Sequence, residues 1–351
     1  FASMVRTLRQ CGYVGSRLHG GPSMRLLSMA DELGWLISPE SAINEPRGHQ
    51  VADDYWPHAR DHAINMVRLL RNHPSVIYWG LCNEFGSNYM PSDSSKGPWV
   101  DQWLNDLGKE VMQLDPTRTV TFDGENDLGG RGHAGPAPTL NFHYAWQPFK
   151  PTNMIPTTRN WLLEGGMPWQ AIAWDQSKPI MLGEDMYDPY CIHSPYGSAQ
   201  WGGNNAYDPQ IAPRVTFDAY HMLAEGYYRA GVAVWNPWGL NETRPAGKAY
   251  VELGQSMPDY LCATDEVNRT FASGQTVNRT LRIYNMLFAD QQATLESQLL
   301  VDGKPTTHNL SRMTLKAGQS HVMPVTLPMP SVQKVKTVQW QLRLVSENDQ
   351  V

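Results

Sequence analysis

Short apolar runs alternate with helix-like segments from the start of the chain to about Pro258. Alternation of this kind is typical of a parallel sheet whose strands are joined by crossover helices. The pattern therefore predicts an α/β fold for this part of the chain. The seven candidate strands are Tyr13–Leu18, Trp35–Pro39, Val76–Asn83, Thr119–Asp123, Thr139–Tyr144, Pro179–Glu184 and Gly231–Asn236.

A closed (β/α)8 TIM barrel needs eight strands, one more than the pattern provides. The chain opens on a helical pattern at Phe1–Gln10, so we expect the first strand to lie upstream of Phe1. An open barrel would expose an unpaired strand edge. Residues 1–260 are therefore predicted to form a catalytic barrel that is incomplete at its N-terminus and is not a complete folding unit by itself.

The pattern changes after Cys262, where strand-like segments follow one another without a helical period. Examples are Thr280–Asn285, Ala293–Val301 and Val335–Val345, separated by turns such as the one at 302–303. Their number and length predict an all-β immunoglobulin-like sandwich over residues 261–351. It contains no catalytic cluster, and we interpret it as structural packing, with carbohydrate binding as the alternative.

One predicted strand ends on a carboxylate that follows a distinct motif. Ala63, Val67 and Leu70 share one face of the preceding helix, and Pro74 prevents that helix from continuing. The stretch then runs through Ser-Val-Ile-Tyr-Trp-Gly-Leu-Cys and stops on Asn-Glu, which places Glu84 at the carboxyl end of a buried strand. Active sites of barrels lie at these strand ends.

A second predicted strand, Pro179–Glu184, also ends on a glutamate. Barrel closure would bring Glu84 and Glu184 around one mouth. Two carboxyl groups about 5–5.5 Å apart are the arrangement of a retaining glycosidase, in which one is the acid and base and the other is the nucleophile. Either glutamate alone is explained equally well as a surface residue at a strand end, but the pair in this register favours catalysis.

Composition narrows the possible functions. The net charge of −6 argues against nucleic acid and anionic membranes as partners, and no apolar run approaches the length of a membrane span. We expect neither cofactor nor metal, because no His/Asp cluster or close cysteine pair has ligand spacing. The sequons at Asn241, Asn268, Asn278 and Asn309 fit a secreted protein, so a periplasmic or extracellular location is somewhat favoured.

The motif Arg71–Glu84 resembles the acid/base signature of glycoside hydrolase family 2, which includes β-galactosidases, β-glucuronidases and β-mannosidases. Leu26–Pro39 resembles the family's third βα unit, the run Leu-Gly-Glu ending at Glu184 resembles its nucleophile strand, and Val232–Trp238 resembles its eighth strand. The resemblance covers most of residues 1–240. It implies a (β/α)8 barrel, a retaining mechanism, a carbohydrate substrate and N-terminal β-domains in the same polypeptide.

Carried over by matching positions, Glu84 would be the acid/base and Glu184 the nucleophile. The resemblance implies that Asn83 binds the sugar 2-hydroxyl, that Tyr144 supports the nucleophile and that His19 binds sugar. The family's arginine precedes that histidine by three residues, whereas Arg17 precedes His19 by two. Arg17 is therefore a substrate-binding candidate whose role beside the nucleophile does not follow from the resemblance.

Three further residues are candidates for the cleft. Trp235 and Trp238 would supply a platform against a sugar face, and barrel packing explains them equally well. His143 is a cleft candidate without an assigned role. The sequence thus predicts a retaining exo-β-glycosidase, with β-galactosidase-like substrates favoured. The alternatives are an endo-acting β-glycan hydrolase and a non-catalytic carbohydrate-binding barrel.

Overall fold

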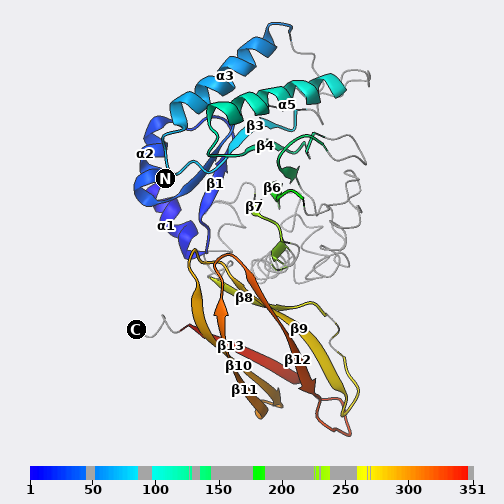
Figure 1. Cartoon of the computed structure of the whole chain (residues 1–351). Coiled ribbons are helices and arrows are strands. Elements are labelled where there is room, and N and C mark those ends of the chain that lie inside the picture. The colour runs from blue at the N-terminus through cyan, green and yellow to red at the C-terminus, as the bar shows by residue number, and fades with distance from the viewer. Residues whose placement is uncertain are drawn as a thin grey trace, which may run out of the picture. The chain divides into compact units, whose positions relative to one another are not determined.

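A computed structural model describes residues 1–44, 52–85, 97–125, 127–128, 135–143, 177–185, 225, 227–228, 231–237, 259–266, 268 and 270–346. The chain divides into two compact units, Phe1–Met257 and Pro258–Val351 (Figure 1). In the described ranges no helix is both long and apolar enough to cross a membrane. Among the described cysteines, Cys11, Cys82 and Cys262 are free thiols.

The first unit alternates helices with short strands, as the sequence predicts. Its helices are α1 (Ala2–Gln10), α2 (Met24–Leu33), α3 (Tyr55–Leu70) and α5 (Gly97–Leu114). Its strands are β1 (Gly15–Leu18), β2 (Leu36–Pro39), β3 (Trp79–Asn83), β4 (Val120–Asp123), β5 (Leu140–His143), β6 (Ile180–Asp185) and β7 (Val234–Pro237). Each corresponds to one of the seven predicted strands, with ends displaced by a few residues, so these predictions are confirmed.

These strands are parallel and follow one another in chain order. Strand β1 pairs with β2, and β3 pairs with β4. Strand β6 lies between β5 and β7 and pairs with both. Isolated parallel bridges such as Glu40↔Gly80 connect β2 to β3. The Asn141 side chain connects β5 to β4 by donating to Thr121 Oγ1 and Asp123 Oδ1, both at 2.8 Å. The described residues do not trace a closed barrel, so closure by an eighth strand stays a prediction.

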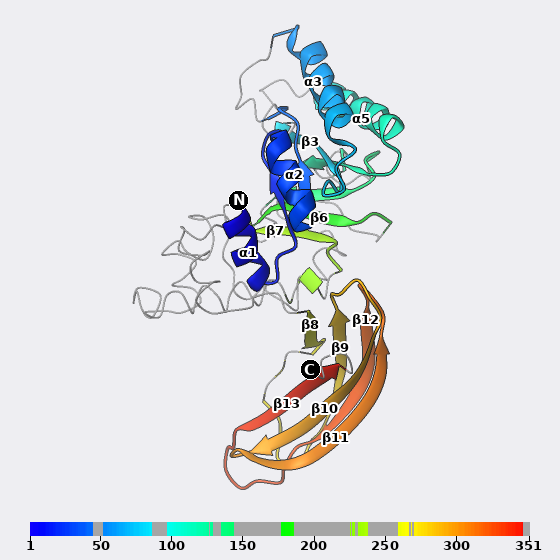
Figure 2. The same ribbon diagram turned by 90° about the vertical axis from the view of Figure 1, so that its left-hand side faces the viewer.

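Irregular register is concentrated at the carboxyl ends of these strands. The pairing shifts between Gly80 and Asn83 in β3, between Phe142 and His143 in β5, and between Leu182 and Asp185 in β6. Figure 2 shows the neighbouring strands β6 and β7 side by side. Bulges redirect side chains and are common beside active sites. The strand ends are thus built to point particular side chains toward one another.

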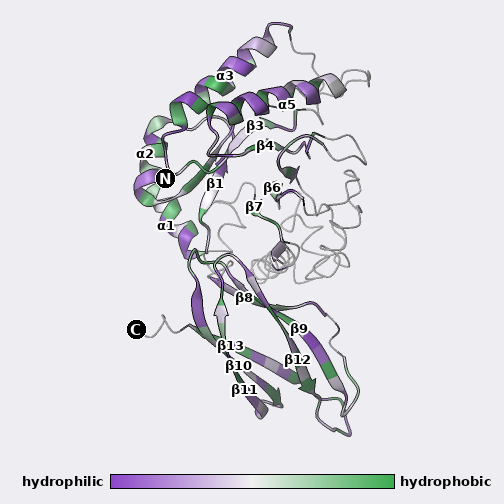
Figure 3. Cartoon of the chain, in the orientation of Figure 1, coloured by the Kyte–Doolittle hydropathy of each residue, from purple (hydrophilic) through white to green (hydrophobic). Residues whose placement is uncertain are grey.

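Helices α3 and α5 lie side by side on the outside of the strands (Figure 1). Both alternate hydrophobic and hydrophilic positions along their length (Figure 3). Ala63, Val67 and Leu70 of α3 are buried, which confirms the predicted face. Across the outer side of the pair, Arg60 Nε donates to Glu110 Oε2 at 2.8 Å. The apolar face toward the strands holds both helices in place.

The second unit consists of strands alone in its described part. These are β8 (Tyr260–Thr264), β9 (Thr276–Asn285), β10 (Gln291–Val301), β11 (Lys304–Leu315), β12 (Ser320–Pro328) and β13 (Val338–Ser346). They form two antiparallel sheets with orders β11-β10-β13 and β12-β9-β8. Leu281 and Ile283 of one sheet share a core with Leu295 and Leu315 of the other. The unit is therefore a β-sandwich, as expected from the alternating pattern.

One side chain binds several backbone carbonyls of the turn that leads into β3. Arg118 donates to three backbone carbonyls: to that of Val76 from Nε at 2.7 Å, and to those of Arg71 and His73 from its two Nη atoms at 2.9 and 3.0 Å. Its Nη1 also lies 2.9 Å from Asp115 Oδ2. Because β3 ends on Asn83, this clamp at the start of the strand helps to position the residues at its end.

We expect Arg118→Ala to lower the free energy of unfolding by about 2–3 kcal/mol, because several hydrogen bonds to a charged group are lost together. Lys109→Ala is the matched control. Its ammonium group forms an exposed pair with Asp106 at 3.0 Å, and we expect a change of under about 0.5 kcal/mol. Urea unfolding of the full-length protein measures both. Equal effects of the two substitutions would contradict the clamp.

Candidate active site

Polar and charged side chains gather at the carboxyl ends of the parallel strands. Proteins with this strand arrangement place their active sites at this end. The side chains are Arg17 on β1, Glu40 directly after β2, Asn83 and Glu84 at the end of β3, Asp123 on β4, His143 on β5 and Glu184 on β6.

The Arg17 guanidinium lies at the centre of this group and is fully buried. Its Nη1 donates to Glu184 Oε1 at 2.8 Å, and its Nη2 donates to Asn83 Oδ1 at 2.6 Å. Its Nε donates to Glu40 Oε2 at 2.8 Å and lies 3.2 Å from Asp123 Oδ1. One buried cation therefore joins side chains from the ends of β1, β2, β3, β4 and β6.

Three buried carboxylates share this single guanidinium. Burial disfavours the charged form of Arg17, but the charges of Asp123, Glu40 and Glu184 outweigh it and raise the pKa of Arg17 above its ordinary value. Burial also raises the pKa of Glu40, although the charge of Arg17 opposes this shift. Within the described residues, Glu40 Oε1 and Asp123 Oδ2 are buried without a hydrogen-bond partner. The site therefore holds three carboxyl groups around one cation, and burial favours the neutral form of Glu40.

Asn83 is buried and held at both ends of its amide. Its Oδ1 accepts from Arg17, and its Nδ2 donates to Asn44 Oδ1 at 3.0 Å. Arg17 offers donors alone, so the oxygen of the amide must face it. The orientation of Asn83 is thus determined by its partners, with the nitrogen directed toward Asn44.

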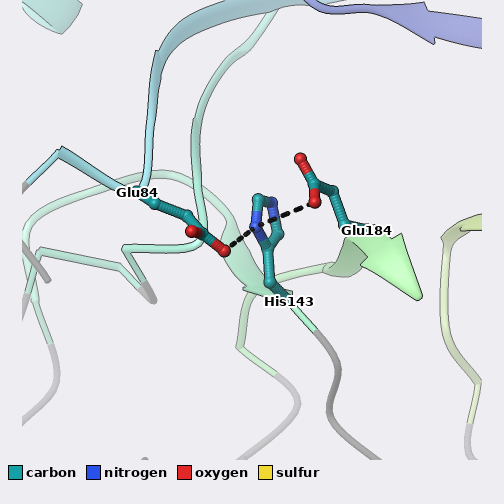
Figure 4. Close-up of side chains that lie close together, drawn as sticks. All are labelled: Glu84, His143 and Glu184. Atoms are coloured by element: carbon teal, nitrogen blue, oxygen red, sulfur yellow. Dashed lines mark hydrogen bonds and ion pairs between the residues drawn. The ribbon is translucent and has the colours of Figure 1, made fainter. Parts of the chain in front are cut away.

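Glu84 and Glu184 lie on either side of His143 (Figure 4). His143 Nδ1 is 2.7 Å from Glu84 Oε1 and 3.9 Å from Glu184 Oε2. One ligand-type atom from each of the three side chains lies within 4.8 Å of the other two. The Glu84 side chain is 22% exposed and that of Glu184 is 6% exposed. Glu84 therefore has more access to solvent than Glu184.

The same three side chains have a spacing that would allow a metal ion. Two carboxylates and an imidazole form a donor set that Zn²⁺ accepts. A cation there would have to replace the contact between His143 Nδ1 and Glu84 Oε1. The geometry therefore fits a hydrogen-bonded pair better than a metal centre.

Two glycines allow this close arrangement. A Cβ on Gly183 would lie 2.4 Å from Asp123 Oδ1 and 2.9 Å from His143 Nε2. Gly124 has a φ of +81°, and a Cβ there would lie 2.9 Å from Glu84 Cγ. Glycine is the residue that permits both a positive φ and such close approach.

The remaining predicted site residues differ in position. His19 Nε2 lies 3.6 Å from Glu40 Oε1, and a third of its side chain is exposed. Trp235 on β7 is partly buried, and its ring centroid lies 5.2 Å from that of Tyr227. This contact supports the packing interpretation of Trp235. Tyr144 and Trp238 lie outside the described residues.

Two carboxylates of this site were given no role from the sequence. Glu40 and Asp123 both stand at the end of a short apolar strand, which is the signal that selected Glu84 and Glu184. Neither belongs to a distinctive motif. The strand-end signal could therefore have found them, although it could not have shown that they meet at Arg17.

Comparison with known proteins identifies a related family of domains. The family model described as the TIM barrel domain of glycosyl hydrolases family 2 matches residues 23–188. Residues 23–188 of this chain are therefore similar to that barrel domain. The resemblance to this family that the sequence indicated is thereby confirmed.

Two curated relatives are β-galactosidases. The enzyme of Enterobacter cloacae is 25% identical over 188 residues, an alignment that covers 51% of this chain and 16% of that protein. The enzyme of Aeromonas hydrophila is 30% identical over 104 residues, covering 28% of this chain and 9% of that protein. The chain thus matches a small part of the length of these relatives.

Two solved structures resemble the chain along 99% of its length. A β-D-mannosidase from Dictyoglomus thermophilum has a TM-score of 0.62 at 13% identity, and 46% of that chain is covered. An exo-chitosanase from Amycolatopsis orientalis has a TM-score of 0.59 at 14% identity, and 45% of that chain is covered. At such low identity these similarities concern the fold alone.

We expect Gly183→Ala to lower the free energy of unfolding by about 1–3 kcal/mol or more, because the added methyl group has no room between Asp123 and His143. Gly21→Ala is the matched control, since a Cβ at Gly21 would have no neighbour within 4 Å. Thermal and urea unfolding of both full-length variants measure the difference. If the Gly183→Ala protein is as stable as the control, the close contacts inferred around Gly183 are contradicted.

Proposed function

We propose that this protein is a retaining exo-β-glycosidase that acts on terminal β-linked sugars, with galactosides favoured. The observation that carries the proposal is the pair Glu84 and Glu184, whose facing carboxylate oxygens lie within 4.8 Å of each other. Retaining enzymes hold their carboxyl groups about 5–5.5 Å apart, whereas inverting enzymes leave about 6.5–9.5 Å for a water molecule. The separation supports the retaining class.

The surroundings of the two glutamates support different roles. Glu184 is nearly buried and accepts from the Arg17 guanidinium at 2.8 Å, which suits a group that reacts as an anion. Glu84 is more exposed and stands where a leaving group or a water molecule has access. We therefore assign the nucleophile to Glu184 and the acid/base to Glu84.

The reaction follows from these roles. Glu184 attacks the anomeric carbon and the glycosidic C–O bond breaks, while Glu84 gives its proton to the departing oxygen. This leaves a glycosyl ester on Glu184. Glu84, now a base, takes a proton from water as the water attacks the same carbon and Glu184 departs. Asn83, held rigidly beside the pair, is placed to bind a ring hydroxyl.

The charge of the site favours a sugar without a carboxylate. Arg17 is already shared by Glu40, Asp123 and Glu184, so no cation is left over in this group of side chains for an acidic sugar. A uronic acid would add a further negative charge close to buried carboxylates. Neutral galactosides, the substrate class that the names of the two relatives imply, avoid this repulsion.

We expect Glu184→Gln to lower kcat of the full-length protein on a nitrophenyl β-galactoside by about 10³-fold or more, because no covalent intermediate can form. Glu32→Gln is the matched control, since Glu32 lies on the exposed side of α2. Its rate should equal that of the unaltered protein. Undiminished turnover by Glu184→Gln would exclude this residue as the nucleophile.

Glu84→Gln should affect substrates according to their leaving group. We expect a loss of about 10²–10⁴-fold in kcat/KM on methyl β-galactoside, whose leaving group needs the proton. The loss in kcat/KM on dinitrophenyl β-galactoside should be far smaller, because that leaving group departs without protonation. Steady-state kinetics on the two substrates decide the point. Equal losses of kcat/KM on the two substrates would show that Glu84 is not the general acid.

A further inference from the structure

The imidazole of His143 lies between the two proposed catalytic carboxylates (Figure 4). Its Nδ1 is within hydrogen-bond distance of Glu84 Oε1 at 2.7 Å, but it is 3.9 Å from Glu184 Oε2. Hydrogen bonds weaken steeply beyond about 3.2 Å between these atoms. Of these two carboxylates, Nδ1 therefore forms its hydrogen bond with Glu84.

The ring has little freedom to leave this position. The His143 side chain is 4% exposed. A Cβ on Gly124 would lie 3.1 Å from its Nδ1, and a Cβ on Gly183 would lie 2.9 Å from its Nε2. The backbone of two neighbouring strands thus closes on both ring nitrogens, and the ring orientation is set by packing.

The surroundings keep this ring neutral. Burial is the main cause that lowers the pKa of His143 to about 4, and the charge of Arg17 acts in the same direction. Glu184 and Asp123 raise the pKa and His19 lowers it, each with a smaller effect. At neutral pH the imidazole therefore has one N–H donor and one acceptor nitrogen.

The proposed mechanism restricts which nitrogen carries the hydrogen. Glu84 has to be protonated in the first step and ionised in the second. If Nδ1 were the acceptor, it would bind the very proton that Glu84 must transfer. If Nδ1 carries the hydrogen, it donates to Oε1 in both states of Glu84, and Oε2 is left to carry the proton toward the substrate.

We propose that His143 is a positioning residue for Glu84: its neutral Nδ1–H tautomer donates to Glu84 Oε1 throughout the reaction and directs Oε2 to the glycosidic oxygen. This inference rests on the proposed function and extends it to a residue on a neighbouring strand. His143 does not exchange a proton with the substrate. It fixes which oxygen of Glu84 does so.

Kinetics of three variants of the full-length protein test the role. His143→Leu removes the donor, and His143→Asn keeps an amide N–H close to the position of Nδ1. His73→Asn is the matched control, because His73 Nδ1 also contacts a carboxylate, Asp31 Oδ2, at 2.6 Å but precedes β3. All four proteins are assayed on methyl and dinitrophenyl β-galactosides.

For His143→Leu we expect kcat/KM on the methyl galactoside to fall about 10- to 100-fold more than on the dinitrophenyl galactoside, since a misplaced acid harms only the substrate that needs it. His143→Asn should recover most of this difference, and His73→Asn should show none. Equal losses on both substrates would overturn the positioning role while leaving the proposed function intact. If the unaltered protein cleaves no β-glycoside, the proposed function fails and this role fails with it.

A second measurement does not depend on activity. Nitrogen-15 NMR of the histidine-labelled protein, with the His143 signal assigned from the His143→Asn spectrum, distinguishes the two neutral tautomers. We expect hydrogen on Nδ1 and a bare Nε2 from neutral pH down to about pH 5, in keeping with the lowered pKa. Hydrogen on Nε2, or a charged ring at neutral pH, would overturn the proposal.

Discussion

The buried guanidinium of Arg17 is the interaction on which the arrangement of this site depends. From β1 its contacts reach the ends of four other strands, and its planar set of donors determines where each partner must lie. Desolvation makes buried ion pairs weak sources of stability. Removing Arg17 would nevertheless leave Glu40, Asp123 and Glu184 as buried charges without compensation, so its main effect is on the specificity of the arrangement.

The strand ends can reach Arg17 because their regular pairing is interrupted. Register shifts in β3, β5 and β6 occur next to the paired residues Asn83, His143 and Glu184. Gly183 supplies the space that the close approach of β4, β5 and β6 requires. In an ordinary sheet, irregular pairing and a glycine without a side chain reduce stability. Here they bring functional side chains from separate strands into contact.

The sequence predicted the strands and the two glutamates well, because apolar runs that end on carboxylates are local patterns. It named His143 as a cleft candidate but did not predict its contact with Glu84. Which residue of Asn-Phe-His-Tyr enters the site depends on a register shift between Phe142 and His143, and this shift has no local signal. Asn141 and His143, two residues apart, share the face of β5 toward the site.

The contacts of Glu40 and Asp123 with Arg17 also could not be predicted from the sequence. Both carry the same strand-end pattern as Glu84, but their common partner lies 23 residues before Glu40 and on a different strand. Contacts between distant segments follow from the curvature of the whole strand array. A local pattern can therefore nominate such residues, and only the fold can show which of them are neighbours.

The backbone at Glu84 joins these constraints. Its φ of +46° is a left-handed conformation that a residue with a long side chain rarely adopts, with a cost of about 1–3 kcal/mol. The hydrogen bonds from Asn83 N to Ile43 O and from Glu84 N to Asp123 O, at 2.9 and 2.8 Å, hold the chain in this turn. A regular continuation of β3 would carry the carboxylate onward along the strand. The turn instead directs it across Gly124 to His143, so the strain at Glu84 is the local cost of pairing the two carboxylates.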